Sequence, residues 1–298
     1  MTNTPMKIVV LLRESCDPHP PVRLTADGYG VQERGLRRIA NPADLAAMEQ
    51  ALRLAERQGG EIICLAVGPQ RLDDHLRLAM SLGGHRAIRV WNEHLTGGDV
   101  VSASRLLARI IEILAPDLIL TGNRLLDRGD DPALALAAAR LSLPCLSAIL
   151  ELKCQGSGLQ ALRKSDRGAR QMVLSQLPCA LLVEADSCEP RYPGQQALME
   201  AATVPLEQWG LAELGLPTTE LGVAAARLGK GQCAFPRPNP RRVETPDATL
   251  PAFERILALL SGGIKPRAGK LHSLSAQQTA ESLLQVLRGE GLLGGETR

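Results

Sequence analysis

The chain has 298 residues, 45% of them hydrophobic, and a formal net charge of +2. This length allows one large domain, or one domain with an arm. No apolar run approaches the roughly 18 to 20 residues that a membrane span needs. The small net charge and an aromatic content of 2% argue against a nucleic-acid-binding surface. We therefore expect a cytoplasmic protein, with no nucleic acid as a partner and no direct insertion into a membrane.

The cysteines and histidines show no pattern of a metal or disulfide site. Seven cysteines are scattered along the chain, never as a C-x-x-C pair, and the five histidines lack the spacing of metal ligands. Disulfides, iron–sulfur clusters and structural zinc are therefore not supported. We expect no metal site.

The first half of the chain alternates between strand-like and helix-like segments. The apolar run 7–12 is typical of a buried parallel strand, and 17–38, rich in proline and glycine, predicts a long excursion or hairpin. Asn41 and Pro42 open a helix that ends at Gly59-Gly60. Further strands are expected at 61–67, 87–91 and 117–121, and further helices at 72–82 and 102–114. Repeated strand–helix units with short links predict an α/β fold with a doubly wound, mostly parallel sheet.

The pattern changes after Leu143-Pro144. Segments 148–153, 159–163, 171–174 and 179–184 are expected to be strands in hairpins, with a turn at 155–158, and 189–202 a turn into a helix. From about Leu221 the regular pattern fades, 229–251 is rich in Gly, Pro and Arg, and 275–288 predicts a last amphipathic helix. We expect an α/β domain over 1–220 and an arm with a helix over 221–298 that wraps a partner, because this segment has little core of its own.

Residues 117–141 form the segment around which the domain is organised. A short strand ends at Gly122, a polar loop follows at 123–131, and a helix begins at Pro132 with Asp131 as its cap. Such a corner is where open α/β sheets bind nucleotides, since backbone N–H groups and the helix dipole face outward there. It is equally the form of an ordinary strand-to-helix connection.

No motif of a known catalytic site occurs in the sequence. Walker, G-x-G-x-x-G, G-x-S-x-G and H-E-x-x-H patterns are all missing. The cluster Asp73-Asp74-His75 lies in an expected surface helix, where solvated residues are common. Arg13 follows the first strand and serves either a ligand or a salt bridge at the rim. The residues favour a binding or carrier subunit over a catalyst.

Several segments, in order, resemble one known family. They are Lys7–Arg13, Ile39–Asp44, Leu65–Pro69, Leu78–Gly84, Asp117–Gly122 followed by Asp127, Ala161–Arg163 through Gln171 and Pro178, and Glu189–Pro193 with Leu198-Met199. Together they resemble the β subunit of electron transfer flavoproteins, the FixA-like family, over roughly 6–216 and more weakly through the C-terminal helix.

The resemblance implies a fold, partners and cofactors. The fold is the adenine nucleotide alpha hydrolase-like α/β domain with a β-hairpin addition and an extended C-terminal arm. The chain pairs with an α subunit that holds most of the FAD, and the β subunit itself holds an AMP, or a second FAD in bifurcating members. The pair is an electron carrier from a flavin-dependent dehydrogenase to a quinone-reductase-type acceptor, not an enzyme.

The family's cofactor-binding positions are carried over by residue. They are Leu11, Asn41, Pro42, Val67, Gly122, Asp127, Arg128, Gly129, Asp130, Asp131, Ala133 and Leu134. Ala133 and Leu134 replace a threonine and a glycine of the family, and Asp131-Pro132 replaces amides. A carboxylate about 4 Å from a phosphate charge costs about 4 kcal/mol at an effective dielectric near 20, and Pro132 lacks an N–H. Arg128 or Arg124 offsets part of this cost. We hypothesise that AMP binding is weakened, rearranged or lost, and that a second FAD is disfavoured.

The partner-recognition residues are also carried over by position. They are Tyr192, Gly194, Gln195, Gln196, Leu198 and Met199. The family has an apolar anchor and a lysine-rich helix start here. The change is therefore either neutral drift or a sign of a donor other than acyl-CoA dehydrogenases, such as a demethylating amine dehydrogenase.

Two other interpretations remain for the whole chain: a stand-alone adenine-nucleotide-binding α/β protein, acting as a hydrolase or a sensor, and a structural subunit that has lost its nucleotide.

Overall fold

The computed structural model describes residues 5–155, 158–229, 231–235, 246–260 and 274–289. The chain forms two compact units, Met1–Ala234 and Phe235–Arg298. The first unit contains a large sheet, and the second contains the helices α8 (Ala252–Leu260) and α9 (Ala276–Gly289). Among the helices of the described residues, none combines the length and the apolar character that crossing a membrane requires.

A nine-stranded sheet forms the centre of the first unit, in the order β11-β10-β9-β12-β6-β1-β4-β5-β13. The strands from β9 to β13 in this order run parallel, and β10 and β11 continue the sheet beyond β9 as antiparallel strands. The strands are β1 (Met6–Leu11), β4 (Gly60–Val67), β5 (Arg86–Val90), β6 (Leu118–Gly122), β9 (Cys145–Gln155), β10 (Gly158–Lys164), β11 (Arg170–Gln176), β12 (Cys179–Val183) and β13 (Glu207–Trp209). The predicted doubly wound, mostly parallel α/β fold is confirmed.

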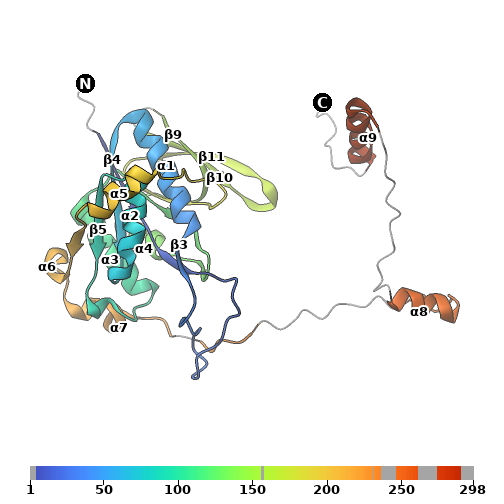
Figure 1. Ribbon diagram of the computed structural model, residues 1–298, viewed down its shortest axis with the longest axis horizontal. Helices are drawn as coiled ribbons and strands as arrows, with labels where there is room; N and C mark the ends of the chain where they lie inside the picture. The colour runs from blue at the N-terminus through green and yellow to red at the C-terminus, as the bar shows by residue number, and fades with distance from the viewer. Residues whose placement is uncertain (1–4, 156–157, 230, 236–245, 261–273, 290–298) are drawn as a thin grey trace. The chain divides into compact units, whose positions relative to one another are not determined.

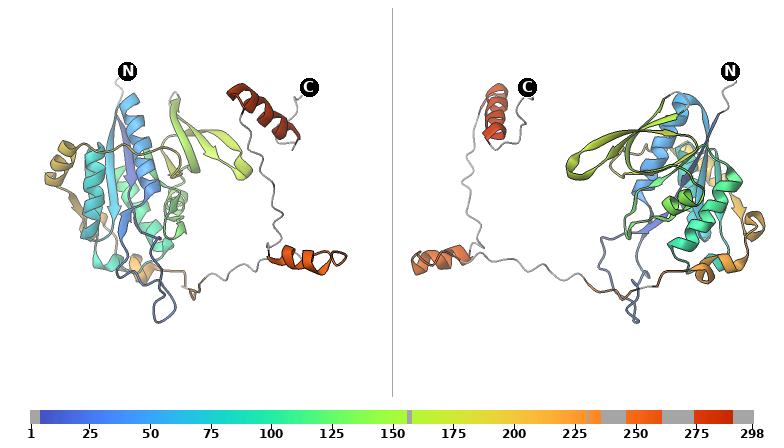
Figure 2. Two further views of the ribbon diagram at one scale, coloured as in Figure 1. Left: turned by 45° about the vertical axis from the view of Figure 1, so that its right-hand side comes forward. Right: turned by 180° about the vertical axis from the view of Figure 1, so that it is seen from behind.

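Helices cover both faces of this sheet (Figures 1 and 2). One core lies beneath α1 and α2, and the other lies beneath α3 and α4. The helices are α1 (Pro42–Gln58), α2 (Asp73–Leu82), α3 (Val100–Leu114), α4 (Ala133–Arg140), α5 (Gln195–Thr203), α6 (Leu211–Leu214) and α7 (Gly222–Ala225). Short pairs are β2 (Glu14–Cys16) with β3 (Arg38–Ala40) and β7 (Arg124–Leu125) with β8 (Gly129–Asp130), and 3₁₀ turns are Gln70–Leu72, Glu93–Leu95, Asp166–Gly168 and Thr218–Glu220.

Strand β1 shows why the central strands read as continuous apolar runs. Ile8 and Val10 belong to the core beneath α1 and α2, whereas Val9 and Leu11 belong to the core beneath α3 and α4. Successive side chains of a strand point to opposite faces, and here both faces are buried. The four residues of β1 that are buried, 8–11, are accordingly all apolar.

The predicted starts of α1 and α4 are confirmed to within one residue, whereas α3 begins two residues before the predicted 102. Helix α1 begins at Pro42 with Asn41 as its N-cap and is followed by Gly59, whose φ of 76° favours glycine. Helix α4 begins at Ala133 rather than at Pro132, and the Oδ1 atom of Asp131 accepts a hydrogen bond from the Ala133 N–H at 3.1 Å. The N-cap is thus Pro132 rather than the expected Asp131, and Asp131, one residue earlier, still accepts a hydrogen bond from the first helical residue.

The prediction that 179–184 forms a hairpin strand is wrong. Strand β12 runs parallel to both neighbours, between β6 and β9. All of its residues are buried, which is typical of a central parallel strand. Strand β9 also begins at Cys145 rather than at 148. Its pairing with β12 shifts register between Leu146 and Ile149, and Ala148 in this interval has a φ of 58°.

The C-terminal part differs from the expected pattern at one place. Helix α8 lies where no regular structure is predicted, whereas α9 confirms the helix expected at 275–288. Residues 156 and 157 of the expected turn, and 236–245 of the Gly-, Pro- and Arg-rich segment, lie outside the described residues.

Candidate functional site

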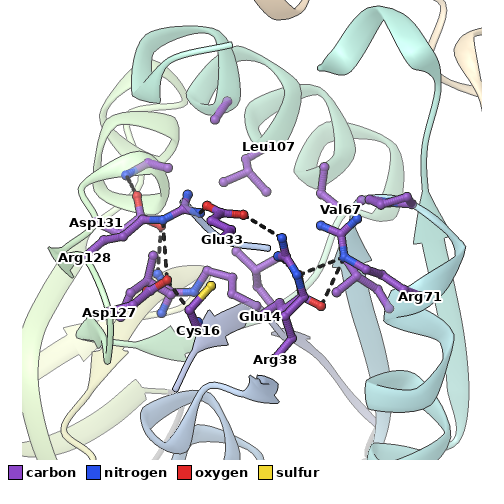
Figure 3. A pocket seen from close by; sticks show the side chains of 18 of the residues that line it. Glu14, Cys16, Glu33, Arg38, Val67, Arg71, Leu107, Asp127, Arg128 and Asp131 are labelled. Carbon is purple, nitrogen blue, oxygen red and sulfur yellow. Dashed lines mark hydrogen bonds and ion pairs between the residues drawn. The ribbon is translucent and has the colours of Figure 1, made fainter. Parts of the chain in front are cut away.

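A cavity of about 350 Å³ opens at the carboxyl ends of β1 and β4. The chain runs from β1 to β4 on one side and returns to β6 on the other, so β1 lies at the point where the strand order reverses. Ligands of open α/β sheets bind at such a point. We call this site the switch-point cavity (Figure 3).

Six of the predicted cofactor-binding residues line the switch-point cavity. They are Leu11, Val67, Asp127, Arg128, Asp131 and Ala133. The apolar part of the wall comes from β1, β4 and α3, through residues such as Leu11, Val67 and Leu107. A concave site with an apolar wall and a few polar groups is the usual form of a small-molecule site.

The other six predicted residues lie near the cavity but are not part of its lining: Asn41, Pro42, Gly122, Gly129, Asp130 and Leu134. Asn41 is buried and braces the loop after β6, since its amide donates to the Arg124 carbonyl at 2.9 Å and its oxygen accepts from the Leu126 N–H at 3.2 Å. Leu134 belongs to the core beneath α4. Gly122 packs against α1, where an added Cβ would collide with Ala43. Asn41, Gly122 and Leu134 therefore support the wall from behind, whereas the Asp130 side chain is 79% exposed.

A buried ion pair holds one side of the cavity together. Asp44 of α1 is 1% exposed and pairs with Arg13 at 2.6 Å. Arg13 also bonds the Gly122 carbonyl at 2.6 Å and Asp131 at 2.9 Å. Burial works to lower the pKa of the Arg13 guanidinium, but Asp44 and Asp131 outweigh it and raise that pKa above its ordinary value. Arg13 is therefore a structural cation that ties three segments together.

A second network of ion pairs lies among the residues that line the cavity (Figure 3). Arg38 bonds Glu14 at 2.6 Å and Glu33 at 2.5 Å. Arg71 bonds Glu14 at 3.0 Å. Arg128 contacts Glu33 at 3.3 Å. Each guanidinium in this network therefore has a carboxylate partner from the same chain.

The charges that line the cavity cancel. Four arginines (Arg13, Arg38, Arg71 and Arg128) face four carboxylates (Glu14, Glu33, Asp127 and Asp131). A phosphate site normally offers cations and N–H groups in excess. The residues present therefore do not fit a nucleotide phosphate.

The cavity does not contain the usual parts of a catalytic centre. Its thiol, Cys16, has a pKa raised by burial and then by Glu33, so the reactive thiolate is disfavoured. Within the described residues, no group of His, Cys, Asp and Glu side chains is arranged to hold a metal ion.

The partner-recognition residues lie on or before α5, in what we call the recognition segment (190–203). Tyr192 is 93% exposed and Met199 67%. Behind them, Arg191 pairs with Glu49 at 2.8 Å and with Glu56 at 2.5 Å, both on α1. At the other end of α5, Arg77 donates to the carbonyls of Ala201, Ala202 and Val204. The segment is fixed at both ends while its apolar side chains face solvent.

Four of the charged residues that line the cavity were not predicted. Glu14 and Glu33 are not among the predicted site residues, and neither are Arg38 and Arg71. Glu14 follows the first strand closely, so its place at the carboxyl end was a usable signal. Glu33 lies within the predicted excursion 17–38, which has no period that places a side chain.

Comparisons with known proteins identify the family of the chain. The family model described as the electron transfer flavoprotein domain matches residues 29–214. The chain is 28% identical to the electron transfer flavoprotein subunit beta of Methylophilus methylotrophus over 223 residues, which are 74% of this chain and 84% of that protein. It is 27% identical to the subunit beta of Bacillus subtilis (strain 168) over 286 residues, 96% of this chain and 98% of the relative. It is also 28% identical to Protein FixA of Rhizobium meliloti (strain 1021) over 221 residues, 71% and 74% of the two chains. Because the matching model spans more than half of the sequence, the chain belongs to the electron transfer flavoprotein domain family.

Proposed function

We propose that the chain is the β subunit of a heterodimeric electron transfer flavoprotein. The family match over residues 29–214 carries this proposal, because it includes the recognition segment and most of the residues that line the switch-point cavity. The pair takes electrons from a flavin-dependent dehydrogenase and delivers them to a quinone-reductase-type acceptor. FAD, held mainly by the α subunit, supplies the redox chemistry when bound.

The chain's own residues bind partners and keep the scaffold rigid. The recognition segment presents Tyr192, Leu198 and Met199 on a surface that Arg191 and Arg77 hold in place. Exposed apolar and aromatic side chains on a rigid support are typical of protein docking sites. The cavity, with its paired charges, has a supporting and ligand-binding role and takes no part in electron transfer.

The division into an α/β domain over 1–220 and a clasping arm over 221–298 belongs to the same proposal. Helix α8 has exposed apolar side chains at Phe253, Ile256 and Leu260, and α9 has them at Leu283 and Val286. Such faces are expected to be covered by another protein. The α subunit is the partner that the proposal assigns to them.

The donor is proposed to be a dehydrogenase other than the acyl-CoA dehydrogenases, such as a demethylating amine dehydrogenase. Gly194, Gln195 and Gln196 replace the anchor and the basic helix start that the resemblance implies, and changed anchors change the partner. Affinity capture with the intact heterodimer tests this. Recovery of acyl-CoA dehydrogenases alone would contradict it.

Co-expression with a candidate α subunit tests the main proposal. We expect a stable two-chain complex with the absorption spectrum of a bound flavin, recovered from the cytoplasmic fraction. A chain that stays monomeric, forms no yellow complex and turns over a substrate unaided would instead support a stand-alone nucleotide-binding protein.

A further inference from the structure

We propose that Glu33 and Asp131 occupy the two anion-binding positions of the switch-point cavity, and that the cavity therefore accepts an uncharged purine nucleoside in preference to a nucleotide. The choice of purine ligands follows the resemblance, which implies an AMP in the β subunit, and so rests on the proposed function. Its basis in the structure is the internal pairing of charges around one apolar wall.

The first anion-binding position lies where α4 begins. An arginine beside a helix N-terminus would attract a phosphate. Here Asp131 takes both attractions, because its Oδ2 atom lies 2.9 Å from Arg13 and its Oδ1 atom accepts from the Ala133 N–H at 3.1 Å. A phosphate at this place would meet a carboxylate instead of unpaired donors.

The second anion-binding position lies between two arginines from distant parts of the chain. Glu33 bonds Arg38 at 2.5 Å with one oxygen and contacts Arg128 at 3.3 Å with the other. A phosphate group binds arginines through the same kind of paired oxygens. Glu33 is therefore a carboxylate from within the chain at a place suited to a ligand's anion, and a phosphate must displace it or lie beside it.

The apolar wall remains available to a ligand. Leu11, Val67 and Leu107 line the cavity without belonging to either network. A neutral ring gains burial against these side chains and breaks no ion pair. A nucleotide gains the same burial but brings a phosphate against charges that are already cancelled, so the structure favours the nucleoside.

Equilibrium dialysis of the full-length chain with adenosine and with AMP tests the inference. We expect the wild-type chain to bind adenosine at least about tenfold more tightly than AMP, which corresponds to about 1.4 kcal/mol. Glu33→Ala should raise the affinity for AMP at least about tenfold and change the affinity for adenosine by less than about threefold. Because Glu33 is 40% exposed, solvent screening limits the gain.

Glu61→Ala is the matched control. Glu61 is 37% exposed and also pairs with an arginine, Arg86, but it lies at the opposite end of β4 from the cavity. The Glu61→Ala substitution removes the same charge as Glu33→Ala and should leave the affinities for adenosine and AMP unchanged. If Glu33→Ala fails to fold, Glu33→Gln and Asp131→Asn remove the charges while they keep hydrogen-bonding side chains, and both should raise AMP affinity.

Three outcomes would overturn the inference: tighter binding of AMP than of adenosine by the wild type, no gain for AMP in any cavity variant, or no binding of either ligand by any variant. None of these measurements needs an α subunit. A failure to form a yellow heterodimer would therefore contradict the proposed function alone, and an unchanged ligand preference would contradict this inference alone.

Discussion

The switch-point cavity and the recognition segment use ion pairs in opposite ways. In the cavity, the pairs lie on the inner surface, where arginines such as Arg38 end on carboxylates such as Glu33. In the recognition segment, the pairs lie behind the surface, where Arg191 joins Glu49, and apolar side chains such as Met199 face outward. In the cavity the paired charges themselves line the site. In the recognition segment the paired charges support a surface whose apolar side chains are available to a partner.

This contrast separates stability from recognition. Changes in the cavity are expected to alter the free energy of unfolding or the choice of ligand. Changes on the outer face of α5 are expected to alter partner binding alone. A cavity substitution that alters only stability or ligand choice supports this division. A cavity substitution that alters partner binding, or a substitution on the outer face of α5 that alters stability, contradicts it.

The largest effect is expected from Arg13→Ala. This change leaves the buried carboxylate of Asp44 without its guanidinium partner. Breaking a buried pair by removing one member costs about 3–5 kcal/mol. Urea denaturation, followed by circular dichroism, measures the loss in the free energy of unfolding.

Arg124→Ala is the control for that experiment. The Arg124 side chain pairs only at the surface, with Asp130, and both side chains are more than half exposed. Its loss is expected to cost less than about 1 kcal/mol. Equal costs for the two substitutions would mean that Arg13 does not stabilise the cavity wall.

A smaller effect is expected from Arg191→Ala. Glu49 is 5% exposed in its side chain and would lose its bonds to Arg191, but it would keep Arg53. Loss of hydrogen bonds to a charged group costs about 2 kcal/mol. Urea denaturation at pH 7 measures this difference.

The cost of Arg191→Ala is expected to depend on pH. Burial works to raise the pKa of Glu49, but hydrogen bonds from Arg191 and Arg53 outweigh it and lower that pKa below the ordinary 4.5. The stabilisation is therefore complete above about pH 4.5 and is lost as the pH falls through the lowered pKa. The difference between the wild type and the variant should shrink as the pH falls from 5 through the lowered pKa. A cost that stays constant over this range would contradict the role of Glu49.

Arg77→Ala should act locally rather than globally. Its guanidinium donates to three carbonyls at the end of α5, and each such bond contributes about 1 kcal/mol at most in this exposed place. We expect faster hydrogen exchange over residues 195–203 and little change elsewhere. Arg57→Ala, at the exposed end of α1, should leave exchange in α5 unchanged. Uniformly faster exchange in the Arg77 variant would indicate global destabilisation instead.

Local signals explain how much of this structure the sequence predicts. The apolar run of β1 and the Asn41-Pro42 start of α1 are each complete within a few residues, and both predictions are confirmed. The place of Asp131 in the cavity was also found, because the start of a helix is a local feature. The partners Glu33 and Arg128 lie 95 residues apart, and no periodicity connects them. The parallel pairing of β12 was missed for the same reason, since strand order depends on contacts between distant segments.

The smallest effect on stability is expected from Met199→Ala. Met199 is 67% exposed, so its truncation should change the free energy of unfolding by less than about 0.5 kcal/mol. Under the proposed function it should weaken docking of the donor dehydrogenase by about tenfold, because exposed anchors carry much of the binding energy. Met172→Ala on β11 makes the same chemical change at a side chain that is 55% exposed, and it should leave donor docking unchanged. Electron transfer from the dehydrogenase to the flavin of the intact heterodimer measures both. Equal losses would place the docking surface outside α5, and a loss of stability in Met199→Ala would show that the outer face of α5 also supports the fold.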